Sequence, residues 1–178
     1  MIIEQANAPL PEEAEACNFS FEVTCEAAPP FEGSSIERIV PVAPYRKSYP
    51  LDPERYCSYT GRDDRALFVA WDEAKFIGYV AVAQSWNNYA QIDDISVDVS
   101  ARRKGAGRLL LNAAIEWAHS RALPGLRLET QSNNVAACCF YERHGFTLGG
   151  FDRHLYRTIM TDTPETALFW YLIFPPTM

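Results

Sequence analysis

The segment at residues 91–111, QIDDISVDVSARRKGAGRLLL, constrains the fold more than any other part of this chain. Its first half mixes β-branched apolar residues with acidic ones, which predicts a β-strand. Its last residues begin an apolar periodic run that continues to about residue 121, which predicts an amphipathic helix. RRKGAG at 102–107 lies between the two, so a basic, glycine-bearing turn connects a strand to a helix.

This turn has the composition of an anion-binding loop. Successive backbone N–H groups of such a turn can point at one anion, and the N-terminus of the following helix adds about half a positive charge at the same place. Glycines leave room for phosphate oxygens to reach the backbone. The sequence therefore predicts a phosphate cradle, with an arginine-rich surface turn as the alternative. The cradle residues are Arg102, Arg103, Lys104, Gly105, Ala106 and Gly107.

The cradle belongs to neither of two common nucleotide-binding motifs. It is not a Walker A loop, because Gly107 is followed by Arg108 and Leu109 instead of Lys and Ser or Thr. It also lacks the G-x-G-x-x-G pattern of dinucleotide-binding turns.

Length and net charge narrow the class of partner. The 178 residues suffice for one domain with a full core. They include 16 Lys and Arg against 23 Asp and Glu, which gives a formal charge of −7. Such a protein is poorly suited to bind nucleic acid or an anionic membrane surface, and it favours a small cationic partner. We therefore expect neither nucleic acid nor a membrane as partner.

The N-terminal residues 1–17 are rich in Ala, Glu and Pro and lack the basic and apolar regions of a signal peptide. No stretch approaches the roughly 18 apolar residues of a membrane span. We expect a cytoplasmic protein with a flexible segment at 1–17 and one domain at 18–178. The five cysteines form no C-x-x-C pair and no Cys/His cluster, so no metal site is expected.

The remaining periodicities predict one mixed α/β domain. Three antiparallel strands in succession lead into the turn, and the helix after it returns to a further strand in a right-handed crossover. A proline-bounded loop is expected at 44–50 and a short irregular helix within 51–64. Strands are predicted at 19–26, 36–42, 66–72, 76–86, 92–99, 126–130, 146–148 and 167–174, and helices at 105–121 and 135–143.

A second motif follows the turn and the next strand. It reads N-N-x-x-A-x-x-x-Y-x-x-x-G-F, with Asn133-Asn134, Ala137, Tyr141 and Gly145-Phe146 at its fixed positions. The two motifs in this order, within residues 66–174, resemble the GNAT superfamily of acetyl-CoA-dependent N-acetyltransferases.

A closer resemblance is to the streptothricin acetyltransferases, which detoxify an antibiotic that bears a β-lysine amine. It extends back to about residue 36 and rests on residues outside the generic cofactor motif. The segments that carry it are PYRK at 44–47, RLETQSNNV at 127–135, GFTLGG at 145–150, ETA at 165–167 and the aromatic run FWY at 169–171.

The resemblance implies the fold and the co-substrate. The expected fold class is α/β (α+β): a GNAT-like single domain with a mixed, mostly antiparallel central sheet flanked by helices, whose splayed central strands bind acetyl-CoA. In this family the pyrophosphate sits on the turn matched here by residues 102–107, and the pantetheine arm lies along the preceding strand end. The other cofactor-binding residues implied are Ile95, Ser96, Val97, Asn134 and Tyr141.

The family's reaction needs an acid for the departing thiolate and a way to deprotonate the amine. The usual acid is a tyrosine at the position of Tyr141, whose ordinary pKa of about 10 keeps it protonated at neutral pH. The alternative is that its ring only packs under the cofactor. Asp93 and Asp94 on the central strand are predicted to point to opposite faces, and we favour Asp93 as the group that holds the cation or takes its proton. Glu129 is the third candidate, with a salt bridge to Arg127 or a solvated position as its alternative.

The predicted reaction is direct acetyl transfer, in a ternary complex, to the β-lysine amine of streptothricin, which would confer resistance to the antibiotic. Another small amine (an aminoglycoside or polyamine), a protein N-terminus, and a non-enzymatic acyl-CoA-binding sensor module are the alternatives. The apolar run 167–174 fits a homodimer interface and, equally, a buried strand in a monomer. The candidate substrate-binding residues are Tyr45, Arg46, Trp86 and Asn87.

Overall fold

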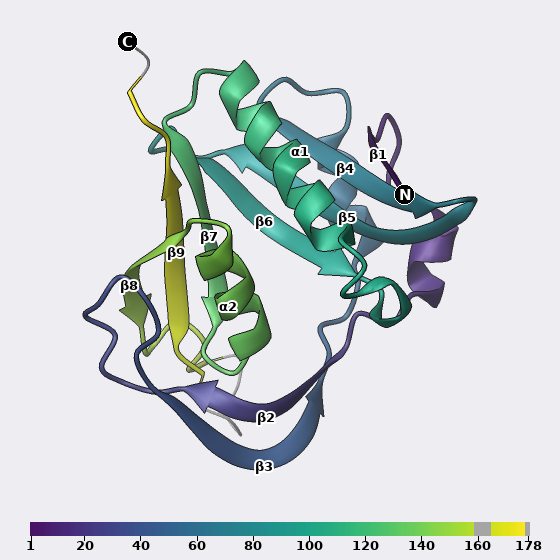
Figure 1. The fold of residues 1–178 in the computed structure, drawn as a ribbon. Helices are drawn as coiled ribbons and strands as arrows, with labels where there is room; N and C mark the ends of the chain where they lie inside the picture. Colours follow the sequence, from purple (N-terminus) through teal and green to yellow (C-terminus); the bar gives the residue numbers. More distant parts are fainter. Residues whose placement is uncertain (159–164, 177–178) are drawn as a thin grey trace. The chain divides into compact units, whose positions relative to one another are not determined.

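The computed structural model describes residues 1–158 and 165–176 (Figure 1). The chain divides into two compact units. Unit 1 contains Met1–Ser20, Ser48–Leu126 and the C-terminal end from Pro175. Unit 2 contains Phe21–Lys47 and Arg127–Phe174. The single domain expected over 18–178 stays a prediction.

Unit 1 is built on strands in the order β1-β4-β5-β6, and each neighbouring pair is antiparallel. These strands form where β-branched and aromatic residues gather, as in FIGYVAV of β5. Helix α1 (Ala106–Ser120) packs on β4, β5 and β6 through its apolar face (Figure 1). The connections contain the 3-10 helices η1 (Glu12–Ala16), η2 (Pro53–Tyr59) and η3 (Val99–Ala101). The strands are β1 (Ile2–Gln5), β4 (Arg65–Asp72), β5 (Lys75–Gln84) and β6 (Ala90–Val97).

These bounds confirm the predicted hairpin, the central strand and the helix that follows the turn, and η2 is the irregular helix expected within 51–64. The N-terminal segment differs from the expectation of a flexible end. β1 pairs with β4, with Ile2 opposite Trp71. Leu10 and Ala14 are buried in the core of unit 1. Composition alone could not indicate this pairing, because the partner strand lies far away in the sequence.

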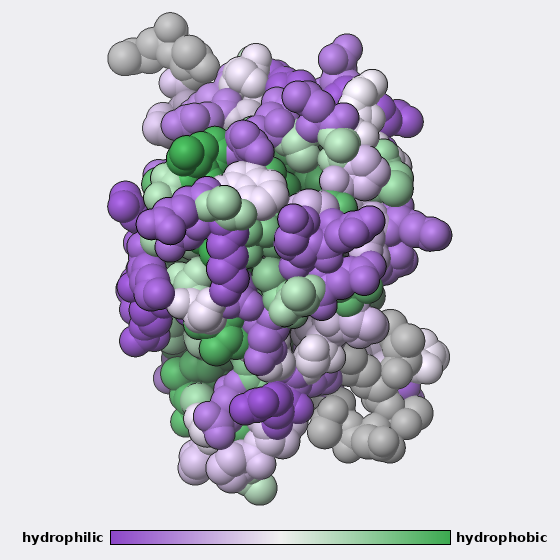
Figure 2. Space-filling model, turned by 90° about the vertical axis from the view of Figure 1, so that its right-hand side faces the viewer, coloured by the Kyte–Doolittle hydropathy of each residue, from purple (hydrophilic) through white to green (hydrophobic). Residues whose placement is uncertain are grey.

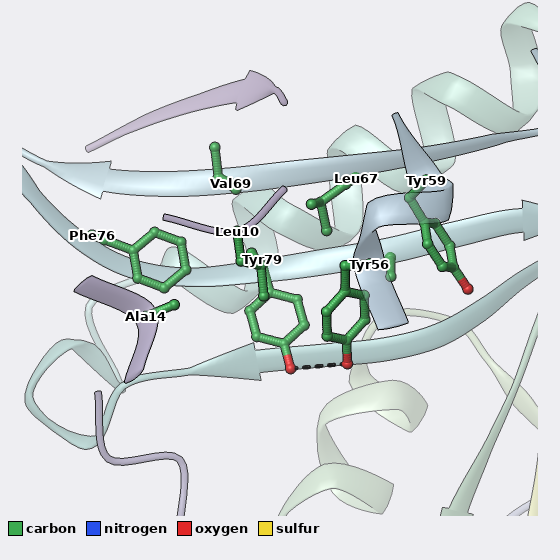
Figure 3. Close-up of a cluster of buried hydrophobic side chains, with 9 residues drawn as sticks. Leu10, Ala14, Tyr56, Tyr59, Leu67, Val69, Phe76 and Tyr79 are labelled. Carbon is green, nitrogen blue, oxygen red and sulfur yellow. Dashed lines mark hydrogen bonds between the residues drawn. The ribbon is translucent and has the colours of Figure 1, made fainter. Parts of the chain in front are cut away.

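The core cluster of unit 1, shown in Figure 3, contains three tyrosines among aliphatic and aromatic side chains. Tyr56 and Tyr59 come from η2 and Tyr79 from β5, and their side chains are 2%, 7% and 2% exposed. The hydroxyl oxygens of Tyr56 and Tyr79 lie 3.2 Å apart. A buried hydroxyl needs a hydrogen-bond partner, and the carboxylates of Asp93 and Asp94 on β6 accept from these three tyrosines.

Unit 2 contains an antiparallel hairpin of β2 and β3, strands in the order β7-β9-β8, and helix α2 (Val135–Arg143). β8 and β9 are antiparallel. In β9 the side chains of Ala167, Leu168 and Trp170 are fully buried, which already explains the apolar run; a homodimer through it stays a prediction. The strands are β2 (Phe21–Ala27), β3 (Ile39–Lys47), β7 (Gly125–Gln131), β8 (Thr147–Asp152) and β9 (Ala167–Ile173).

Hydrophilic side chains cover most of the surface that Figure 2 shows, with hydrophobic ones between them. Across residues 1–158 and 165–176, no helix is long and apolar enough to span a membrane.

Candidate functional site

The basic turn has the geometry expected of a strand-to-helix connection. β6 ends at Val97, η3 follows, and α1 begins at Ala106. Arg103 and Gly105 have φ values of +65° and +96°, so the backbone changes direction through two left-handed residues. A Cβ added at Gly105 would meet no atom within 4 Å, so the space beside this residue is open. The first N–H groups of α1 have no carbonyl partner within the helix and can bind an anion there.

The Arg102 side chain binds backbone carbonyls of the protein, whereas the sequence predicted that it would bind phosphate. Its guanidinium donates to three backbone carbonyls: from Nε to Val97 at 2.9 Å, from Nη1 to Ser20 at 2.8 Å, and from Nη2 to Phe19 at 2.9 Å. Its planar fork thereby fixes the end of β6 to the segment that precedes β2. Arg103 and Lys104 are exposed, so these two side chains are the ones available to a phosphate.

Replacing Arg102 by lysine is expected to lower the free energy of unfolding by about 1.5–3 kcal/mol, because an ammonium group cannot reach three diverging carbonyls. Arg103→Lys, which makes the same change at an exposed position of the same turn, is expected to stay within about 0.5 kcal/mol of the parent. Urea denaturation measures both. Equal values for the two variants would contradict the anchoring role of Arg102.

Replacing Gly105 by valine is expected to weaken coenzyme A binding by about tenfold or more, because a branched side chain strains the left-handed backbone and fills the approach to the N–H groups. Gly61 is a matched control. It also has a positive φ, +69°, and no atom within 4 Å of an added Cβ, and it lies outside the turn. Calorimetric titration with coenzyme A should show loss of affinity for Gly105→Val but not for Gly61→Val. Equal affinities of the two variants would contradict the prediction that this turn binds phosphate.

The central strand carries a β-bulge at Asp93. Ala81 of β5 pairs with Asp94 and Val82 pairs with Ile92, so Asp93 is the extra residue of β6. The predicted alternation of Asp93 and Asp94 is therefore wrong: Asp93 accepts a hydrogen bond from Tyr59 at 2.5 Å and Asp94 accepts one from Tyr56 at 2.6 Å. Both tyrosines belong to η2, three residues apart, so the bulge turns two consecutive carboxylates toward one short helix.

Asp94 is held on both carboxylate oxygens. Oδ2 accepts from Tyr56 at 2.6 Å and from Tyr79 at 2.8 Å, and Oδ1 accepts from Ser96 at 3.1 Å. Burial, with the Asp94 charge as the next cause, raises the pKa of Tyr56 and of Tyr79, so both remain hydrogen-bond donors at neutral pH. Asp94 is thus a carboxylate fixed in one orientation by three hydroxyl groups.

Asp93 has fewer partners. Tyr59 donates to its Oδ2, and no other described residue donates to either oxygen. Burial raises the pKa of Asp93, while the Tyr59 hydrogen bond opposes the rise. A half-buried carboxyl group with a raised pKa and an oxygen that accepts no hydrogen bond from the described residues is suited to take up a proton.

The strand end predicted to line the pantetheine arm is Ile95–Val97, which pairs with Val80, Tyr79 and Gly78 of β5. A Cβ at Gly78 would lie 2.4 Å from the carbonyl oxygen of Ser96, so only glycine permits this close pairing. The Ser96 hydroxyl donates to Asp94 Oδ1.

Trp86 and Asn87 lie in the loop that joins β5 to β6. The loop is closed by hydrogen bonds from the N–H of Ser85 to the Tyr89 carbonyl and from the N–H of Asn88 to the Ser85 carbonyl, both 2.9 Å long. Trp86 is 91% exposed, which is unusual for the largest apolar side chain. The structure thus places both predicted substrate residues at one loop of unit 1.

Tyr141 belongs to α2 in unit 2, and Asn134 is the N-cap residue of the same helix. The side chain of Asn134 accepts a hydrogen bond of 3.2 Å from the N–H of Ala137, so it caps the helix instead of remaining free for the cofactor. Tyr141 is buried, and its ring packs against Phe140, Phe146 and Trp170. These contacts fix the ring and fit either of the two predicted roles for Tyr141.

Glu129 is not paired with Arg127 as the alternative reading proposed. Its Oε1 accepts a hydrogen bond from the hydroxyl of Tyr156, to which Gln131 also donates at 3.1 Å. Burial, followed by the nearby charge of Glu165, raises the pKa of Glu129 against the opposing effect of the Tyr156 bond.

Tyr45 and Arg46 lie on β3, which continues to Lys47 through the segment expected to be a loop. The cause is pairing with β2, in which Val23 lies opposite Tyr45 and Glu22 opposite Arg46. Strand alternation separates the two predicted substrate residues. The Tyr45 hydroxyl accepts from Asn133 at 3.0 Å, whereas Arg46 is exposed.

Sequence reasoning missed the tyrosines that hold Asp93 and Asp94, and it missed the partners of Glu129. Tyr56 and Tyr59 have a three-residue spacing that a 3-10 helix brings to one side, and this was an available signal. Glu165 belongs to the ETA segment at 165–167, which indicated the family but gave no role for this residue. The missed residues are Tyr56, Tyr59, Tyr79, Lys47, Tyr156 and Glu165.

Comparison with known proteins agrees with this description. Residues 34–146 match the acetyltransferase (GNAT) family. Streptothricin acetyltransferase A of Bacillus subtilis is 42% identical over 131 residues, which are 74% of this chain and 75% of that protein. Streptothricin acetyltransferase of Escherichia coli is 41% identical over 130 residues, 73% of this chain and 71% of its own length.

Two crystal structures extend the likeness to nearly the whole chain. A Bacillus anthracis protein assigned to the streptothricin acetyltransferases, in complex with acetyl coenzyme A, gives a TM-score of 0.84 at 36% identity, with 98% of both chains covered. A nourseothricin acetyltransferase gives 0.77 at 31% identity, again with 98% of both chains covered. The predicted fold class, a mixed and mostly antiparallel sheet flanked by helices, is confirmed. The family match and these identities show that the chain belongs to the acetyltransferase (GNAT) family and is an acyltransferase.

Proposed function

We propose that this protein transfers the acetyl group of acetyl-CoA to an amine of streptothricin, the β-lysine amine first of all, and so inactivates the antibiotic. The observation that carries the proposal is the identity of 42% and 41% to two streptothricin acetyltransferases, which extends over about three quarters of this chain. A likeness restricted to the cofactor motif would support only acetyl transfer. The matched region includes segments outside that motif, which favours this substrate over another small amine or a protein N-terminus.

The residues of unit 1 fit acetyl-CoA, which supplies an activated acetyl thioester. The open, left-handed turn at Gly105 and the first N–H groups of α1 can receive the pyrophosphate. The exposed side chains of Arg103 and Lys104 add positive charge to the same turn. The backbone of Ile95–Val97 can hold the pantetheine arm in the way a neighbouring strand would.

The two carboxylates of β6 suit different tasks toward the amine. Asp94, fixed by three donors, holds the ammonium form, because its orientation is set before the substrate arrives. Asp93 receives one proton from the ammonium, directly or through a water molecule. The nitrogen lone pair then forms the N–C bond to the acetyl carbon while the C–S bond breaks, and Tyr141 gives its phenolic proton to the departing thiolate. The new amide nitrogen loses its remaining extra proton to the Tyr141 phenolate, which restores the acid.

The test is thiol release from acetyl-CoA on mixing the protein with streptothricin, in parallel with a panel of aminoglycosides and polyamines. We expect release with streptothricin and formation of a monoacetylated product, which mass spectrometry identifies. Thiol release only with another amine would show that streptothricin is not the substrate, and the protein would still be an N-acetyltransferase. Coenzyme A binding without release from any amine would overturn the proposal in favour of a sensor or a protein substrate. The need for acetyl-CoA makes the cytoplasm the proposed location.

A further inference from the structure

Unit 2 contains a polar network, buried at its centre and half-buried around it, that the proposed acetyl-transfer steps do not use. At its centre is Glu165, whose side chain is 1% exposed and forms an ion pair with Lys47 of β3. Asn133 donates from Nδ2 to Glu165 Oε1 at 2.9 Å and to the Tyr45 hydroxyl at 3.0 Å. Tyr45 in turn donates to Glu26 at 3.3 Å. Glu129, which accepts a hydrogen bond from Tyr156, has its pKa raised by burial and then by the charge of Glu165. These residues together are called the Glu165 cluster below.

The Glu165 cluster has more negative than positive groups. Glu26, Glu129 and Glu165 provide three carboxyl groups, and Lys47 provides one ammonium group. Burying ionised carboxylates without matching cations is costly, and such groups are normally paired or neutralised. Burial raises the pKa of Glu129, and the nearby charge of Glu165 raises it further. A second cation in the cluster would relieve the excess of negative charge.

Two buried acceptors in the cluster also lack a donor. Neither Glu165 Oε2 nor Asn133 Oδ1 receives a hydrogen bond in the part of the chain that the structure describes. The two residues are 4% and 2% exposed, and they are hydrogen-bonded to each other through Nδ2 of Asn133 and Oε1 of Glu165. Buried polar atoms of native proteins are rarely left without partners, so this pair calls for a donor group that residues 1–158 and 165–176 do not provide.

We infer that the Glu165 cluster is a recognition site for a primary ammonium group of the acceptor antibiotic, distinct from the amine that is acetylated. The inference rests on the proposed function. The two unpartnered acceptors can receive N–H donors of an ammonium group, and Glu129 adds negative charge near Glu165. Lys47 shows that the cluster accepts this chemistry, because its own ammonium group lies on Glu165. A network serving stability alone would need neither the excess carboxylates nor the unpartnered acceptors.

Glu129→Gln tests the site directly. It keeps an oxygen that can accept the Tyr156 hydrogen bond and removes the charge, so the fold is preserved. The dissociation constant of streptothricin, measured by calorimetry with saturating coenzyme A, is expected to rise about tenfold or more, because a charge-assisted hydrogen bond in a buried site is lost. The affinity for acetyl-CoA is expected to be unchanged.

Glu32→Gln is the matched control, since it removes the same charge at an exposed position of unit 2. It should leave the affinity for the antibiotic within about twofold. A Glu129→Gln variant that binds the antibiotic like the parent would overturn the inference. So would one that binds normally but loses kcat, because Glu129 would then act in the chemistry.

Lys47→Met supplies a readout that does not depend on catalysis. The variant leaves Glu165 without its cation, so its melting temperature is expected to fall. Streptothricin should then raise the melting temperature of Lys47→Met by more than it raises that of the parent, since the antibiotic supplies the missing ammonium group. Equal increases in the two proteins would contradict a cation site at this cluster.

These outcomes separate the two proposals. If the parent releases no thiol with streptothricin, the proposed function fails. If the parent acetylates streptothricin but Glu129→Gln and Lys47→Met respond like the parent, only the recognition site fails.

Discussion

Replacing Tyr141 by phenylalanine is expected to lower kcat by about 10²–10⁴-fold, because the departing thiolate loses its general acid. The ring of Tyr141 is held by Phe140, Phe146 and Trp170, and phenylalanine keeps these contacts. The fold and the affinity for acetyl-CoA should therefore be those of the parent. Stopped-flow or steady-state thiol release measures the rate, and calorimetric titration with coenzyme A measures the affinity.

Tyr171→Phe is a suitable control for this experiment, since it removes the hydroxyl of another tyrosine of unit 2 and should leave kcat nearly unchanged. If Tyr141→Phe transferred acetyl groups at the parent rate, Tyr141 would have only the packing role that its ring contacts support. Another group would then protonate the thiolate.

Asp93→Asn is expected to lower kcat by about 10²–10⁴-fold and to leave the protein as stable as the parent or more stable at pH 7. The amide cannot take a proton from the amine, which explains the loss of rate. The expected stability of Asp93→Asn follows from the pKa of Asp93, which burial raises in the folded protein. The folded state binds the proton more tightly than the unfolded state, so the ionised side chain lowers stability as pH rises from the unfolded pKa through the folded one. Asparagine carries no charge and avoids this cost.

The pH dependence gives a second check on Asp93. The kcat of the parent should fall on the acid side at a pH above the ordinary aspartate pKa of about 3.9, because Asp93 must be ionised to act as base. The stability difference between parent and Asp93→Asn should disappear below about pH 3.9, where both states of the parent are protonated. Thermal unfolding across this pH range measures the difference.

Asp94→Asn is the matched comparison, and its stability should change in the opposite direction. Its carboxylate accepts from Tyr56, Tyr79 and Ser96, so loss of the charge weakens three hydrogen bonds and should cost about 1–3 kcal/mol. If Asp93→Asn were destabilised as much as Asp94→Asn, the two carboxylates would not have the separate roles proposed.

The sequence by itself determined the elements that local patterns encode. The strand, the basic turn and the helix within 91–121 are present as predicted, and so is the helix at 135–143. Hydrophobic period, glycine position and capping residues act over a few residues, so they can be read without knowledge of the rest of the chain. The order of the two motifs also sufficed to indicate the family, which the comparisons confirm.

The tertiary structure decided which partners the polar residues have. The bulge at Asp93 depends on pairing with β5, and no local signal in 91–97 reveals it. Arg102 looks like a phosphate ligand in the sequence, but carbonyls 82 and 83 positions earlier, those of Ser20 and Phe19, occupy its guanidinium. Lys47 and Glu165 are 118 positions apart and become an ion pair only when unit 2 folds. Hydrogen bonds and charges act between neighbours in space, and the sequence orders only neighbours along the chain.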